Sequence, residues 1–162
     1  MFEAIKNENS IIMFANQLEP FFLPASMLFF IALWICICKF ISFFGGWKTL
    51  SQDYQVNSAF DGQKLWLKSM AMRRWTSYRN CINVGANKYG LYLSVLPIFR
   101  IGHPPLFFPW TDISTAEDSR PLFGDIVKFN FTRHPDVSII FSKRLADRIF
   151  KMRAESQPGV ST

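Results

Sequence analysis

A long apolar stretch dominates the first third of the chain. It runs from Phe21 to Phe44, and Lys39 is its only charged residue. About 20 apolar residues in a helix that rises about 1.5 Å per residue cover the hydrocarbon core of a bilayer. A buried helix of a soluble protein would carry a polar stripe, and this stretch has none. The pattern therefore predicts one transmembrane helix over residues 21–44.

The flanks of this stretch predict its orientation in a membrane. Residues 1–20 are mixed in polarity and lack a basic run, so we expect an uncleaved extramembrane or interfacial segment. Gly45-Gly46 suggests a flexible exit, and Trp47 suits an interfacial ring. Lys39 and Lys48 lie at the C-terminal end, and short loops that carry lysine stay in the cytoplasm. The expected topology has the N-terminus outside and the C-terminal part in the cytoplasm.

After a polar linker expected over residues 45–63, apolar residues recur with a period of two, as in strands. Runs begin near residues 64, 77 and 91, and Leu65 and Leu67 of the first run should share a face. Asn87-Lys-Tyr-Gly90 is a predicted turn, because Asn and Gly tolerate positive φ. A fourth run, 106–110, contains a proline and should be an edge strand or carry a bulge. We expect at most one short strand near 113–117, and then a hairpin over residues 127–141 that turns at 134–136.

From residue 142 the apolar period becomes 3.6, which predicts a helix. Ser142 is the expected N-cap, Leu145 and Ile149 begin the apolar stripe, and Asp147 and Lys151 could pair across one turn. Residues 156–162 should form a flexible tail. The expected fold is a membrane-anchored α+β protein, in which a domain over residues 64–155 has six or seven antiparallel strands capped by the C-terminal helix. We expect its strands to form two short orthogonal sheets, with the helix closing their open end.

Charge and composition narrow the function classes. The 162-residue chain has a net charge of +6, and from Gly45 onward 16 Lys and Arg stand against 9 Asp and Glu, a net charge of +7. A basic domain next to a bilayer favours anionic lipid first and an acidic protein second. Nucleic acid is not expected, because no motif of a nucleic-acid reader is present. The three cysteines have neither disulfide-framework nor zinc-site spacing, and no catalytic motif occurs, so we expect no cofactor, no metal and no enzyme activity.

The order of elements, strands over 64–141 and then a helix over about 142–155, resembles the pleckstrin-homology-like (PH-like) superfold, which includes bacterial PH-like and GRAM-like domains. Asn87-Lys-Tyr-Gly-Leu-Tyr-Leu-Ser94 and the segment from Phe99 to Ile113 are also similar to a segment of small bacterial membrane proteins. This resemblance implies a PH-like domain in a single-pass protein of the bacterial inner membrane. It implies no activity, because PH-like domains bind lipids, peptides or nothing known. The Arg-x-Arg spacing of phosphoinositide-binding PH domains is absent, so that specificity is not carried over.

Two groups of residues are candidate sites. A basic group could contact anionic head groups or a partner, or could simply be a solvated surface; it comprises Lys68, Arg73, Arg74, Arg79 and Lys88. The same two interpretations apply to the polar face of the terminal helix, with Arg144, Arg148 and Lys151. The second group is a possible loop site at His103 and Arg100. A loop histidine can titrate or bind a metal, but no second ligand has suitable spacing, and the alternative is that His103 fixes the loop through a hydrogen bond.

These observations lead to one functional hypothesis and two alternatives. The first is a non-catalytic binding module, held on the cytoplasmic side of the membrane, for a protein partner or the anionic membrane surface. The second is an accessory structural subunit of a larger membrane complex, held mainly by its transmembrane helix. The third is an enzyme that uses the His103 loop. Membrane lipids are the expected partners, together with a protein whose identity the sequence does not give.

Overall fold

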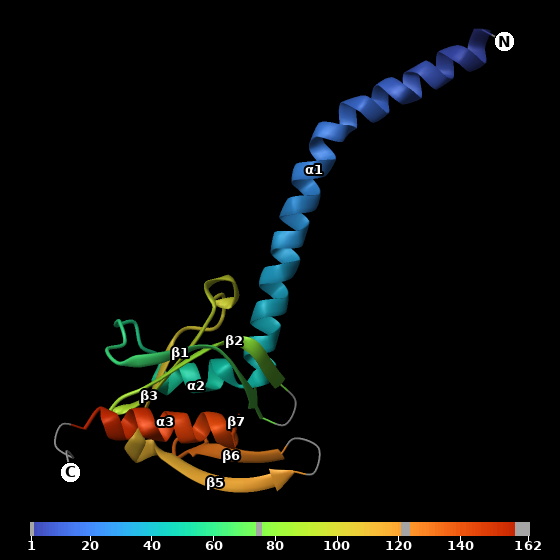
Figure 1. Ribbon diagram of the computed structural model, residues 1–162. Coiled ribbons are helices and arrows are strands. Elements are labelled where there is room, and N and C mark those ends of the chain that lie inside the picture. The colour runs from blue at the N-terminus through green and yellow to red at the C-terminus, as the bar shows by residue number, and fades with distance from the viewer. Residues whose placement is uncertain (1, 74–75, 121–123, 158–162) are drawn as a thin grey trace. The chain divides into compact units, whose positions relative to one another are not determined.

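The structure, a computed structural model, describes residues 2–73, 76–120 and 124–157. The chain divides into two compact units, Met1–Ile37 and Cys38–Thr162. Helix α1 (Phe2–Gly45) accounts for the described part of the first unit, and its residues 38–45 belong to the second (Figure 1). The helix starts well before the predicted residue 21. Its segment Phe22–Gly45 has 24 residues and contains an 18-residue window with a mean hydropathy of 2.4, so it is long and apolar enough to cross a membrane.

The second unit contains one seven-stranded antiparallel sheet, which curls into a half-barrel (Figure 1). The strand order is β4-β3-β2-β1-β7-β6-β5. The strands are β1 (Gln63–Met72), β2 (Thr76–Ala86), β3 (Gly90–Val95), β4 (Leu106–Pro109), β5 (Ile113–Arg120), β6 (Gly124–Phe131) and β7 (Ser138–Ser142). Two helices complete the unit, α2 (Trp47–Tyr54) and α3 (Lys143–Glu155), with short 3₁₀ turns at Pro97–Phe99 and Trp110–Asp112.

The prediction of two orthogonal sheets was wrong, because β1 pairs with β2 on one side and with β7 on the other and so joins both halves. The join is short: only Ala71 and Met72 of β1 pair with β7, opposite Ile140 and Ile139. The rest of β1 has no partner on that side among the described strands. The two halves of the sheet therefore separate along the first part of β1.

Strand β1 is also irregular, which overturns the predicted alternation of its side chains. Its pairing with β2 shifts register on both sides of Lys68, and Leu67 has a φ of 54°. A β-bulge of this kind reverses which face the following side chains occupy. Leu67 is consequently 53% exposed, whereas Met70 and Met72 reach the core.

The sequence predicted one edge strand of the sheet more closely than the other. Strand β4 is an edge strand that ends at Pro109, as predicted. Strand β5 is the other edge and pairs with β6 from Ile113 to Arg120, so it is longer than the predicted strand at 113–117. The predicted turn at Asn87 is confirmed, because its Oδ1 accepts hydrogen bonds from the backbone N–H groups of Tyr89 and Gly90.

Helix α3 covers one end of the half-barrel, packed on β2, β6 and β7. Its predicted stripe is buried, with Leu145, Ala146, Ile149 and Met152 in the core. Ser142 occupies the N-cap position, but its side chain makes no capping hydrogen bond. The predicted Asp147 pair is also wrong, since Lys151 Nζ lies 3.7 Å from Glu155 Oε1 instead.

The segment between α1 and β1 contributes to the core through α2, whose Trp47, Leu50 and Tyr54 are buried. The expectation of an interfacial ring at Trp47 was wrong: the side chain is fully buried, and its Nε1–H donates to Pro104 O at 2.9 Å. The exit from α1 is a fixed turn, because Gly46 has a φ of 90° and is closely packed. A Cβ at Gly46 would lie 3.0 Å from Arg73 Nε and 3.1 Å from Val137 Cγ1.

Candidate functional site

An open groove of about 450 Å³ lies where β1 separates from β7. Strands β1 and β2 line one side and the first turns of α3 the other. The lining residues are Leu67, Lys68, Ser69, Asn80, Ser142, Arg144, Leu145 and Arg148. Three of these side chains are cationic, and none is acidic. We refer to this feature as the basic groove.

The local structure of β1 explains how Lys68 comes to line the basic groove. The two register shifts on either side of Lys68 interrupt the ladder with β2 and re-aim the side chains around it. Ser69 and Asn80 hold the bulge together across the two strands. Ser69 Oγ donates to Asn80 Oδ1 at 3.0 Å and accepts from the backbone N–H of Asn80 at 3.0 Å. A reciprocal pair of this kind fixes the floor of the groove.

Arg144 and Arg148 reach the groove because they are one turn apart on α3 and so share its solvent face. The opposite face carries Leu145 and Ile149 into the core, which fixes the rotation of the helix. Neither arginine, nor Lys68, has an ion-pair partner among the described residues. Lys143 beside them is different: its Nζ contacts Glu117 Oε2 at 2.5 Å, and that hydrogen bond raises the pKa of the lysine.

This arrangement suits an anion. Guanidinium groups form paired, charge-assisted hydrogen bonds with phosphate and carboxylate, and Lys68 adds a point charge. The backbone N–H groups in the first turn of α3 add a favourable dipole at the same wall.

The structure disperses the predicted basic group. Lys68 lines the basic groove, while Arg73 pairs with Asp136 at 3.0 Å. Arg79 is exposed on β2 outside the groove, and Lys88 lies at the far turn with its Nζ 4.9 Å from the centre of the Tyr89 ring. Arg74 lies outside the described residues. The groove instead combines Lys68 with Arg144 and Arg148, which the sequence analysis had treated as a separate group on the polar face of the terminal helix. The spacing of those two arginines by four residues was the available signal.

His103 belongs to the 96–105 loop, is 3% exposed, and forms a separate polar cluster with Tyr78. Its Nδ1 is 3.3 Å from Ile101 O and its Nε2 is 3.2 Å from Tyr78 Oη. A carbonyl can only accept, so Nδ1 carries the proton and Nε2 accepts from the Tyr78 hydroxyl. Burial lowers the pKa of His103 and raises that of Tyr78. The geometry fixes the loop and leaves neither nitrogen open to a substrate. Arg100 of the same loop is exposed.

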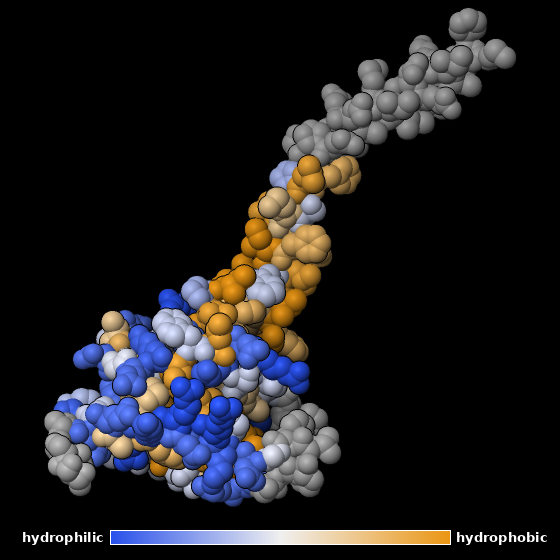
Figure 2. Space-filling model, in the orientation of Figure 1, coloured by the Kyte–Doolittle hydropathy of each residue, from blue (hydrophilic) through white to orange (hydrophobic). Residues whose placement is uncertain are grey.

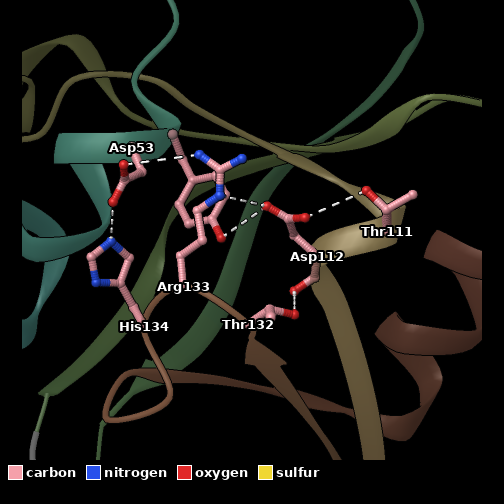
Figure 3. Close-up of polar contacts among 7 residues, drawn as sticks. Asp53, Thr111, Asp112, Thr132, Arg133 and His134 are labelled. Atoms are coloured by element: carbon pink, nitrogen blue, oxygen red, sulfur yellow. Dashed lines mark hydrogen bonds and ion pairs between the residues drawn. The ribbon is translucent and has the colours of Figure 1, made fainter.

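A third polar group joins α2, the 3₁₀ turn at Trp110–Asp112 and the turn after β6 (Figure 3). Arg133 Nε lies 3.1 Å from Asp112 Oδ2, and its Nη1 lies 3.9 Å from Asp53 Oδ1. His134 Nε2 lies 2.7 Å from Asp53 Oδ2, and Tyr54 Oη donates to Asp112. Each carboxylate is thus already paired with a neighbour. Within the described residues, no group of three His, Cys, Asp or Glu side chains is arranged to hold a metal. We interpret this group as structural, with its ion pairs and hydrogen bonds holding the three segments together.

Comparison with known proteins gave no relative. No family model and no curated protein matches the sequence, and no solved structure matches the fold.

Proposed function

We propose that this chain is a single-pass membrane protein whose C-terminal domain is a non-catalytic, PH-like binding module for an anionic group at the cytoplasmic face of the membrane. The observation that carries the proposal is the basic groove, in which three cations without described ion-pair partners surround a cavity of about 450 Å³. A cluster of unpaired like charges is unfavourable on its own, and an anion relieves it.

The surface of the apolar segment supports the membrane part of the proposal. Only 11% of its 18-residue apolar window is buried within the structure, and side chains such as Phe22, Leu28 and Phe30 are more than 60% exposed. Exposing each of these to water would cost about 1.5–3 kcal/mol, and lipid removes that cost. Figure 2 shows apolar colouring over the described part of this segment and mainly polar colouring over the domain. The lysines at positions 39 and 48 favour the cytoplasmic orientation of the domain.

The topology supports the PH-like part. The resemblance implies six or seven antiparallel strands followed by a capping helix, and the domain has seven antiparallel strands followed by α3. Function does not follow from such a fold, so the ligand class is argued from the groove alone.

The anion that we propose for the basic groove is the phosphate group of a lipid, because the proposed span would hold the domain next to the bilayer. The full chain in neutral detergent is titrated with monodisperse dihexanoyl phosphatidic acid in a calorimeter. Dihexanoyl phosphatidylcholine and inorganic phosphate serve as parallel titrants. We expect binding of phosphatidic acid, little binding of phosphatidylcholine, and weaker binding of free phosphate.

The double variant Arg144→Gln/Arg148→Gln is then compared with Arg79→Gln/Lys88→Gln, which removes the same charge outside the groove. At about 1 kcal/mol for each cation, the groove variant should bind about 30-fold more weakly. The control variant should bind like the natural chain. Equal losses in the two variants, or no binding of phosphatidic acid by the natural chain, would overturn the assignment of the groove.

The membrane part has its own test. A reporter fused to the C-terminus should be active only in the cytoplasm, and the full chain should stay with membranes after alkaline washing. Recovery of the full chain in the high-speed supernatant, or a reporter that is active only outside the cell, would refute the proposed membrane span and its orientation.

A further inference from the structure

The 96–105 loop lies against the last two turns of α1. Ser42 Oγ donates a hydrogen bond to Gly102 O, and a Cβ at Gly102 would lie 3.4 Å from Ser42 Cβ and 3.5 Å from Lys39 Cα. These contacts fall within the second unit, Cys38–Thr162. At about 1.5 Å of rise per residue, the loop meets the helix about 5–9 Å before its end at Gly45. The loop is therefore level with the end of the apolar segment.

The exposed face of the last two turns of α1 indicates how far along the helix axis lipid must extend. Cys38 and Ser42 are covered by the domain, whereas Phe40, Phe43 and Phe44 are 62%, 59% and 58% exposed. Each phenylalanine left in water would cost about 1.5–3 kcal/mol. A bilayer that covers Phe43 and Phe44 extends along the axis beyond the level of Lys39. The loop, on the opposite side of the same helix, is then at that depth as well.

The composition of the loop tip fits that depth. Ile98 is 63% exposed and Ile101 is 40% exposed, although both are large and apolar. Arg100 lies between them and is exposed. Two apolar side chains that flank a cation suit the boundary between acyl chains and phosphates, where an arginine stem can lie in the apolar layer and its head among the phosphates.

The loop is also held rigidly by hydrogen bonds, so its exposed apolar side chains lose little conformational entropy when they insert into lipid. Backbone hydrogen bonds close the turn at Phe99→Leu96, Arg100→Pro97 and His103→Arg100. The buried His103 and Trp47 fix its second half from beneath, through Ile101 O and Pro104 O. A segment that is already ordered pays less entropy when it binds.

We infer that the tip of the 96–105 loop, with Ile98, Arg100 and Ile101, inserts into the lipid interface beside the transmembrane helix. This second attachment would hold the domain in one orientation and would prevent it from rotating about a single helical tether. The inference rests on the proposed membrane span, and it concerns a surface distinct from the basic groove.

The test measures lipid contact at single sites in the full chain. Nitroxide labels are attached at Ile98→Cys, Ile101→Cys, Phe30→Cys and Tyr89→Cys. Each of these variants is made in a Cys36→Ala/Cys38→Ala/Cys81→Ala background, whose unfolding midpoint is first compared with that of the natural chain. The labelled proteins are reconstituted in phosphatidylcholine and phosphatidylglycerol vesicles. Electron paramagnetic resonance then gives the collision rate of each label with oxygen, which concentrates in lipid, and with a nickel chelate, which stays in water.

Phe30 reports on the span, and Tyr89 is the water-exposed control. Tyr89 is 66% exposed and follows the far end of β2, whose first residue, Thr76, adjoins Gly45. We expect the oxygen-to-nickel ratio at Ile98 and Ile101 to be several-fold higher than at Tyr89, and highest at Phe30. If Phe30 reports lipid while Ile98 and Ile101 match Tyr89, the loop inference is wrong and the span stands. If Phe30 also reports water, both are wrong.

Discussion

The stability of the domain should depend on pH through His103. The neutral ring fits its site, because Nδ1–H donates to Ile101 O and Nε2 accepts from Tyr78. Burial lowers the pKa of His103 below its ordinary value of 6.5. In the unfolded chain the same histidine titrates near 6.5, so the unfolded state binds the proton more readily. The native state therefore loses stability as the pH falls below about 6.5, and it is unaffected by His103 at higher pH.

The size of this effect has a clear upper limit. If native His103 stays neutral throughout, protonation of the unfolded chain lowers the free energy of unfolding by about 1.4 kcal/mol between pH 7.5 and pH 5.5. That is a tenfold change in the unfolding equilibrium. Any protonation of the native ring reduces the loss.

The assay is urea unfolding of the full chain in a neutral detergent, followed by tryptophan fluorescence at both pH values. The comparison is with His103→Asn, whose amide N–H can still donate to Ile101 O but does not titrate. All other residues are the same in the two proteins, so the difference between their pH dependences reports on position 103. We expect the natural chain to lose up to about 1.4 kcal/mol more than the variant over this pH range. Parallel losses in the two proteins would refute the assignment of the neutral ring.

Two further predictions concern packing, both read from urea unfolding at pH 7.5. Trp47→Phe removes the hydrogen bond to Pro104 O from a fully buried site and should lower the free energy of unfolding by about 1–3 kcal/mol. Trp66→Phe, at an exposed position, should change the free energy of unfolding little. Equal effects of the two substitutions would contradict the buried role of Trp47. Gly90→Ala would place a Cβ 2.3 Å from Phe108 O and should cost about 3 kcal/mol, because the neighbouring backbone of β4 must move. Gly124→Ala meets no atom of the described residues within 4 Å and should cost only about 1 kcal/mol for its φ of 70°, so a larger loss there than at position 90 would count against this packing.

Much of the fold could be predicted from the spacing of apolar residues along the chain. Apolar residues that alternate along Val127, Phe129 and Phe131 predicted β6, and a period of 3.6 from Leu145 predicted α3. These succeed because the side-chain period of a strand or helix is a local property of the backbone. Leu67 was misplaced because a bulge reverses the alternation, and a bulge depends on the partner strand. Trp47 was misplaced because its partner, Pro104, is distant in sequence.

The sequence by itself determined the apolar segment, the basic domain and the order of strands and terminal helix, since hydropathy, charge and periodicity are properties of consecutive residues. Only the tertiary structure decided which charges act together. Lys68 joins Arg144 and Arg148 because β1 leaves β7 after two residue pairs and α3 begins directly at the end of β7. It likewise brought the 96–105 loop, which carries Ile98 and Ile101, against the end of α1 through the contact between Gly102 and Ser42. Such groupings arise from the closing of a sheet over distant segments, which no local pattern records.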